Sequence, residues 1–227
     1  LLPKFVDNME MKMEYFDHCF IEGDTLETSD VVNGGAELFL YQSGYLTIKG
    51  YDDGVYILGF PNFEVRKALY RVVVPALTMK SNSEVVSAQS FLRKMMQDGN
   101  AAEAKKALKA LIADVPYSNK KMASMDMEER YRLIMSTIFR ALGFRVEVER
   151  MLATGRIDMI VEVPSFIYVL ELKLSNNGGI SAAESQIKEK SYTEPFKADK
   201  RKVIALAVEL DETGKGLIDW KEVDESL

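Results

Sequence analysis

The sequence predicts a mixed α/β (α+β) protein whose C-terminal part folds as a mixed β-sheet covered by helices. Apolar residues make up 47% of the 227 residues and charged residues 28%, which is ordinary globular composition and excludes a largely disordered chain. Between residues 126 and 208 the expected elements follow the order helix, three strands, helix, strand. The last of them, Val203 to Val208, is a continuous apolar run, which is typical of a strand buried on both faces. A buried strand that follows a helix indicates a sheet with helices packed on it.

Residues 1–78 are expected to form a small β-hairpin with helices beside it. A short helix over 36–43 is stopped by Gly44. Strands over 45–48 and 55–58 flank Asp52-Asp53-Gly54, which is a hairpin-turn signal. The sequence over 63–74 is again compatible with a helix.

Residues 79–125 are expected to form a helical linker, or a lid beside the next domain. One helix is predicted over 83–96 and is broken by Asp98-Gly99-Asn100. A second is predicted over 101–113, where Ala, Lys and Leu give a strong helix propensity.

Residues 126–227 carry the clearest pattern. Asp126 is a good N-cap for a helix that runs to Leu142 and is closed by Gly143. Three strands and a second helix follow, over 144–150, 156–163, 166–174 and 181–191. The acidic end, residues 211–227, is expected to be peripheral, with Trp220 as a packing anchor.

Composition excludes several kinds of site. With one cysteine, Cys19, and one histidine, His18, the chain can form neither an internal disulfide nor a Cys/His zinc site. It contains no apolar run of about 18 residues, so no membrane span is expected. The chain opens on Leu1-Leu2-Pro3 without a methionine or a secretory signal, so we expect a piece of a longer, cytoplasmic protein.

Charge and missing motifs narrow the function further. The net charge of −6 argues against a uniformly basic surface, but a nucleic-acid enzyme can place positive charge locally. The chain lacks the P-loop pattern, so it is not expected to bind ATP in that manner by itself. It also lacks the G-x-S-x-G, H-E-x-x-H and protein-kinase signatures.

The positive signal lies on two consecutive predicted strands. Alternation places Asp158 on one face of the first strand, and Glu171 and Lys173 together on one face of the second. If the strands pair as a hairpin, the two carboxylates stand side by side and repel each other unless a cation lies between them. Carboxylate oxygens suit Mg²⁺ or Mn²⁺, and a lysine at the same spot would stabilise charge on a phosphate. The alternative interpretation is an ordinary cross-strand salt bridge of Lys173.

These residues lie in motifs that resemble the PD-(D/E)XK nuclease superfamily, whose core is the restriction-endonuclease-like α-β-β-β-α-β arrangement. The motifs are Gly155-Arg156-Ile157-Asp158, Tyr168 to Lys173, and Gln186 to Tyr192. More narrowly, residues 126–227 resemble the nuclease-like domain that follows an AAA-ATPase-like domain in a group of Bacteroides-type bacterial proteins. Residues 36–75 resemble the end of that ATPase-like domain. We therefore interpret residues 1–78 as its C-terminal remnant, with the nucleotide-binding part expected upstream.

The resemblance implies a role for each matching residue. Asp158 and Glu171 would ligate Mg²⁺ or Mn²⁺, with the carbonyl of Leu172 as a third ligand. Lys173 would be the catalytic lysine. Gln186, on the following helix, would contact water or the phosphate.

The first helix is expected to add an acid to the pocket. The resemblance favours Glu129, whereas helical periodicity places Glu128 nearer the apolar stripe. Arg156 is either a phosphate contact or an exposed arginine, and the basic stretch over 188–202 is interleaved with acids, as on a solvated helix face.

The expected function is metal-dependent hydrolysis of phosphodiester bonds in nucleic acid, with DNA the favoured partner, linked to the upstream ATPase-like domain. The alternative is a catalytically silent nucleic-acid-binding or protein-interaction module of the same fold, and an oligomer is left open.

Overall fold

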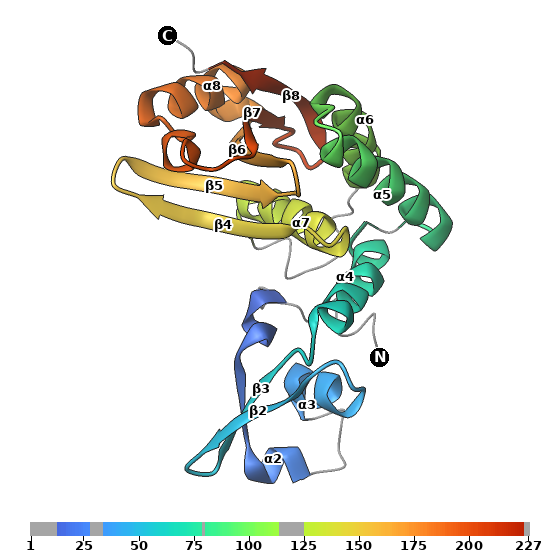
Figure 1. The fold of residues 1–227 in the computed structure, drawn as a ribbon. Coiled ribbons are helices and arrows are strands. Elements are labelled where there is room, and N and C mark those ends of the chain that lie inside the picture. The colour runs from blue at the N-terminus through green and yellow to red at the C-terminus, as the bar shows by residue number, and fades with distance from the viewer. Residues whose placement is uncertain (1–12, 28–33, 79, 114–124, 225–227) are drawn as a thin grey trace. The chain divides into compact units, whose positions relative to one another are not determined.

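The computed structural model describes residues 13–27, 34–78, 80–113 and 125–224 (Figure 1). The chain divides into two compact units, an N-terminal unit of residues 1–72 and a C-terminal unit of residues 73–227. The domain boundaries at 78 and 125 stay predictions.

The N-terminal unit contains a three-stranded antiparallel sheet in the order β1-β3-β2. Its elements are a 3₁₀ helix (Met13–Asp17), β1 (Cys19–Glu22), α2 (Gly23–Glu27), α3 (Gly35–Gln42), β2 (Thr47–Asp52), β3 (Val55–Gly59) and α4 (Phe63–Thr78), which continues past residue 72.

The predicted hairpin of this unit is confirmed. Strands β2 and β3 pair antiparallel around Asp53 and Gly54, whose φ angles are 41° and 85°. Glycine adopts a positive φ without strain, which is why the turn sequence predicted the hairpin. Strand β1 was not predicted, and it adds to the other edge of β3 with Cys19 opposite Leu58, both buried.

The C-terminal unit is built on a five-stranded mixed sheet in the order β4-β5-β6-β7-β8. Strands β6 and β7 are parallel, and the other neighbours are antiparallel. In Figure 1, β4 and β5 extend as a long hairpin at one side of the sheet. The strands are β4 (Arg145–Leu152), β5 (Gly155–Glu162), β6 (Phe166–Leu174), β7 (Lys202–Leu210) and β8 (Leu217–Val223).

The helix-strand order predicted for this part of the chain is confirmed, and the result is a mixed α+β unit consistent with the restriction-endonuclease-like fold. The expectation that 211–227 is peripheral was wrong for Leu217–Val223, which forms strand β8 at one edge of the sheet. Residues 225–227 lie outside the described residues. Trp220 is the packing anchor that was expected: it is buried, and its indole Nε1 donates to the Ala101 carbonyl at 2.9 Å.

Helices cover the sheet. Helix α8 packs on β6 and β7, α6 on β8, and α7 contacts β4, β5 and β6. The helices of this unit that follow α4 are α5 (Asn82–Gln97), α6 (Ala101–Ile112), α7 (Met127–Ala141) and α8 (Gly179–Lys190), with short 3₁₀ helices at Ser175–Asn177 and Glu194–Phe196. Among the described residues, no helix is long and apolar enough to span a bilayer.

The two faces of β6 have separate roles in packing. Ile167 and Val169 join Ala183 and Ile187 of α8 in one buried cluster. Tyr168 points to the other face, where its hydroxyl donates to the Met96 carbonyl of α5 at 2.6 Å. Fully burying such a side chain contributes roughly 1.5–3 kcal/mol, so β6 is held firmly on both faces. Glu171 therefore lies on a rigid strand.

Candidate active site

Strands β5 and β6 bring two buried carboxylates together. The strands pair antiparallel with Met159 opposite Leu170, and the same register places Asp158 opposite Glu171. The predicted hairpin is thus confirmed. Asp158 is 3% exposed and Glu171 0% exposed, so both carboxyl groups lack water as a solvent and need partners within the protein.

Each carboxylate has one close partner on β6. The Lys173 ammonium lies 2.6 Å from Glu171 Oε1, which confirms that both side chains share a face of the strand. The backbone N–H of Leu172 donates to Asp158 Oδ2 at 2.9 Å. The opposite oxygen of Glu171, Oε2, is buried and has no hydrogen-bond partner among the residues that the structure describes.

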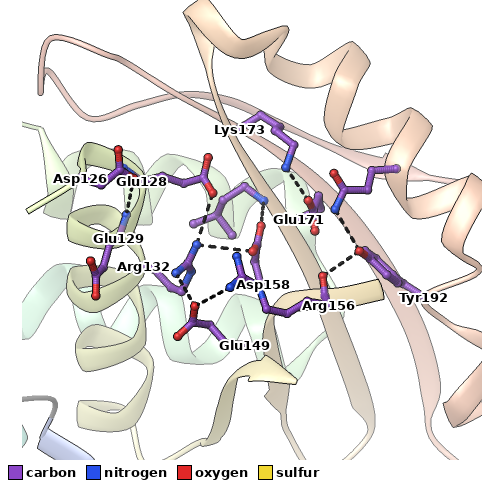
Figure 2. A network of polar contacts seen from close by, with 12 residues as sticks. Asp126, Glu128, Glu129, Arg132, Glu149, Arg156, Asp158, Glu171, Lys173 and Tyr192 are labelled. Carbon is purple, nitrogen blue, oxygen red and sulfur yellow. Dashed lines mark hydrogen bonds and ion pairs between the residues drawn. The ribbon is translucent and has the colours of Figure 1, made fainter. Parts of the chain in front are cut away.

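The first turns of α7 add an acid and an arginine to this pair (Figure 2). The Asp126 carboxylate caps the helix by accepting from the N–H groups of Glu128 and Glu129, at 3.1 and 3.4 Å. Arg132 Nη2 lies 3.3 Å from Glu128 Oε1 and 3.5 Å from Asp158 Oδ1. The arginine therefore joins the helix to the carboxylate pair.

A second arginine reaches the cluster from β5. Glu149 of β4 lies between the pairs Val148–Met159 and Arg150–Ile157, which puts it opposite Asp158. Its Oε1 is 3.1 Å from Arg132 Nη1 and 3.0 Å from Arg156 Nη1. One carboxylate oxygen thus bridges two guanidinium groups.

Gln186 is held by a short chain of hydrogen bonds. Its Nε2 donates to the Tyr192 hydroxyl at 2.9 Å, and that hydroxyl donates to the Arg156 carbonyl at 2.7 Å. Burial, with Glu171 and Asp158 nearby, raises the pKa of Tyr192. The amide is thereby tied beside the carboxylate pair.

The comparison with known families bears on this cluster. Residues 126–220, from the start of α7 into β8, match the model of the PD-(D/E)XK nuclease superfamily. This segment is therefore similar to that superfamily. It contains every residue of the cluster just described.

The other comparisons are less specific. An uncharacterized protein from the vnfD 5′ region of Azotobacter chroococcum mcd 1 is 26% identical over 216 residues, which is 89% of this chain and 40% of that protein. The chain therefore spans less than half the length of this curated relative. No solved structure gives a significant match.

The pKa shifts of the charged cluster follow from its burial. Burial first, and then the neighbouring Asp158, raise the pKa of Glu171. Burial and Asp158 also raise the pKa of Glu128, although Lys173 and Arg132 oppose the shift. The carboxylates around Lys173, Glu171 first, outweigh its burial and raise its pKa, so the ammonium stays charged.

These residues fit a divalent cation. A buried carboxylate oxygen without a partner, Glu171 Oε2, lies beside a second carboxylate, and a hard cation would satisfy both. Within the described ranges, no group of three or more His, Cys, Asp or Glu side chains is placed to hold a metal ion. The protein thus offers two carboxylates, which suits Mg²⁺, since that ion keeps several waters or substrate oxygens.

The structure brings Glu128, and not the favoured Glu129, to the cluster. Glu129 points away from Asp158 in Figure 2, whereas Glu128 is held by Arg132 one turn further along the helix. The i,i+4 spacing of Glu128 and Arg132 was the available signal in the sequence. Glu149 was missed as well, and nothing local in the sequence marks it as a partner of two arginines.

Proposed function

We propose that the segment 126–220 is a divalent-metal-dependent nuclease that hydrolyses phosphodiester bonds. The supporting observation is the pairing of two buried carboxylates, Asp158 and Glu171, across β5 and β6, with Lys173 at 2.6 Å from the second. A purely structural salt bridge between Lys173 and Glu171 would not explain why a second buried acid, Asp158, lies beside Glu171. The match of residues 126–220 to the nuclease superfamily favours the chemical interpretation.

Asp158 and Glu171 would hold Mg²⁺ or Mn²⁺, with the Leu172 carbonyl as a further ligand. The cation, when bound, would polarise a phosphoryl oxygen and lower the pKa of a bound water. The protein residues fix where this takes place. Asp158 is oriented by the Leu172 N–H at 2.9 Å and Glu171 by Lys173, so neither carboxylate has to reorganise.

Lys173 supplies a fixed positive charge. Its raised pKa keeps the ammonium protonated, so it stabilises the negative charge that develops on a phosphate under attack. Gln186, held by Tyr192, would orient water or a phosphate oxygen from α8. Glu128 lies within the electrostatic reach of Asp158 and Lys173 and takes the position that the sequence analysis gave to Glu129.

The substrate we propose is nucleic acid, with DNA favoured. We also retain the proposal that residues 1–78 end an ATPase-like domain whose nucleotide-binding part lies upstream and regulates cleavage. Its support is the resemblance of residues 36–75. Cleavage by a longer chain with and without ATP tests this link.

A cleavage assay tests the nuclease proposal. Plasmid, single-stranded DNA and RNA are incubated with the protein in Mg²⁺, Mn²⁺ or EDTA, beside Asp158→Asn and Lys173→Met. Both variants are expected to lose at least about a hundredfold in rate, the usual cost of removing a group that stabilises transition-state charge. Lys188→Met is the matched control, because this half-exposed lysine of α8 pairs with Glu184 at 3.0 Å.

Cleavage that needs metal and depends on Asp158 and Lys173, but not on Lys188, would support the nuclease. A folded protein that cleaves none of the three polymers in either metal would contradict it for this chain. If that protein still bound nucleic acid, the silent binding module would be the better description.

A further inference from the structure

Two arginines beside the carboxylate pair converge on a single acceptor oxygen. Arg132 Nη1 and Arg156 Nη1 lie 3.1 and 3.0 Å from Glu149 Oε1. Two guanidinium groups around one anionic oxygen is the arrangement in which proteins bind phosphate oxygens. The acceptor in this protein is a carboxylate from its own edge strand.

We propose that Arg132 and Arg156 form a phosphate-binding pair, and that Glu149 occupies it until a phosphodiester of the nucleic acid displaces the carboxylate. This proposal rests on the proposed nuclease function and adds to it a substrate-binding site with a built-in competitor. Arg132 also lies 3.5 Å from Asp158. A phosphate on the two arginines would therefore lie next to the site of cleavage and would fix the position of the strand.

The backbone at Glu149 supports displacement. Its φ is +54°, in the left-handed region that a non-glycine residue rarely adopts, and it lies inside strand β4. Such a conformation costs about 1–3 kcal/mol and is kept only where surrounding contacts impose it. The two arginine contacts of its side chain are such contacts. Strand β4 is the outer strand of the sheet, so residue 149 can change conformation while pairing with one neighbour.

Exposure and charge also favour an exchange of anions. The side chains of Glu149 and Arg156 are 27% and 47% exposed, so a phosphate from solvent can reach them, while Arg132 is buried behind them. The Glu149 carboxylate and an incoming phosphate compete for the same two guanidinium groups, those of Arg132 and Arg156. Withdrawal of Glu149 removes a negative charge that would repel a phosphate.

Binding without cleavage tests the proposal. The affinity for a short fluorescein-labelled DNA duplex is measured by fluorescence anisotropy in EDTA, over a range of salt concentrations. Glu149→Gln keeps the shape of the side chain and removes its charge, and Glu149→Gly also relieves the positive φ. Both variants are expected to bind DNA about tenfold more tightly, since one more charge-assisted phosphate contact forms. The plot of log K against log salt should steepen by about 0.9, the slope for one more neutralised phosphate.

Glu147→Gln is the matched control. It removes the same charge from the same strand, but Glu147 pairs with Arg150, at 3.6 Å, and not with the arginine pair. We expect it to change the affinity less than about threefold. Arg156→Gln added to Glu149→Gln should abolish the gain in affinity and the extra salt dependence.

The proposal is overturned if Glu149→Gln and Glu149→Gly bind DNA no better than Glu147→Gln, or if their gain survives Arg156→Gln. A complete lack of DNA binding by every variant overturns it as well. None of these results decides the nuclease proposal, which is tested separately by metal-dependent cleavage with the wild-type protein. The two failures are therefore distinguishable.

Discussion

Replacing Arg132 by leucine tests how the charged cluster contributes to stability. Arg132 is 8% exposed and lies 3.1 to 3.5 Å from oxygens of Glu128, Glu149 and Asp158. Leucine fills part of the volume but supplies no charge and no donor. Arg132→Leu therefore removes the guanidinium group beside Asp158, which is 3% exposed. The Asp158 carboxylate keeps the hydrogen bond from the Leu172 N–H.

The expected loss is large because the stranded carboxylates are buried. Removing one partner of a buried ion pair typically costs about 3–5 kcal/mol. For a unit of this size, 1 kcal/mol corresponds to a Tm change of about 2–4 °C, so we expect Tm to fall by roughly 10 °C in EDTA. Adding Glu149→Gln removes an acid that has lost one of its two arginine partners and should recover at most about 1 kcal/mol, since Arg156 still pairs with Glu149 at 3.0 Å.

Thermal unfolding followed by tryptophan fluorescence measures this effect in the C-terminal unit, which contains Arg132. Trp220 is the single tryptophan of the chain and lies buried in β8, on the same sheet as Asp158. The control is Arg145→Leu, whose side chain is 78% exposed and pairs with Glu162 at 3.5 Å. An exposed pair is worth under about 1 kcal/mol, so its Tm should barely move. Equal Tm losses for the two variants would refute the reasoning.

Three further predictions follow from individual groups. Because burial and Asp158 raise the pKa of Glu171 to about 8, the folded metal-free protein binds a proton that the unfolded chain releases at lower pH. Stability should therefore fall as pH rises from the ordinary glutamate range toward that value, and a Glu171→Gln variant that keeps the same slope in thermal unfolding would contradict this. Tyr192→Phe removes a hydroxyl bonded to Gln186 and to the Arg156 carbonyl and should cost about 1–2 kcal/mol in urea unfolding, whereas Tyr51→Phe, 62% exposed, should cost little. Burial raises the pKa of Cys19 to about 11, so iodoacetamide should modify it far more slowly in the native protein than in urea near neutral pH, as read by mass spectrometry; equal rates would show that the thiol is accessible.

The carboxylate pair could be predicted from the sequence because its geometry is local. Alternation along two consecutive strands assigns each side chain to a face, and a short connection makes the strands pair as a hairpin. The observed register, with Met159 opposite Leu170, required no knowledge of other elements. The long helix before the strands was predicted for a similar reason, since Asp126 and Gly143 mark its two ends.

Strand β8 could not be predicted in the same way. Leu217–Val223 lies in an acidic stretch and buries Leu217, Trp220 and Val223, so its sequence lacks the two-residue alternation that marks a half-buried strand. Its stability comes from elements distant in sequence: Trp220 donates to Ala101, and Lys105 pairs with Asp219 at 2.6 Å. Contacts across more than a hundred residues leave no local pattern.

The choice between Glu128 and Glu129 shows where resemblance and physical pattern diverge. The two residues share the same N-cap and differ by one position on the helix, about a quarter of a turn. The difference between them is Arg132, which forms an i,i+4 ion pair with Glu128 and also lies 3.5 Å from Asp158. An acid on the first helix is therefore placed by its basic neighbour one turn on, and not by its distance from the N-cap.

The same cations account for the stability of the metal-free cluster and for its proposed function. Without Lys173 and Arg132, Asp158 and Glu171 would be two buried acids with unbalanced repulsion. A divalent cation bound between Asp158 and Glu171 would neutralise their charge. Arg132 would then no longer be needed to balance Asp158, and its charge would be available for a phosphate. Arg132 then keeps Glu128 and Glu149 as its acidic partners, and Arg156 keeps Glu149, whose strained backbone makes it the easier of the two acids to displace. Metal binding and phosphate binding are thus expected to favour each other through Arg132.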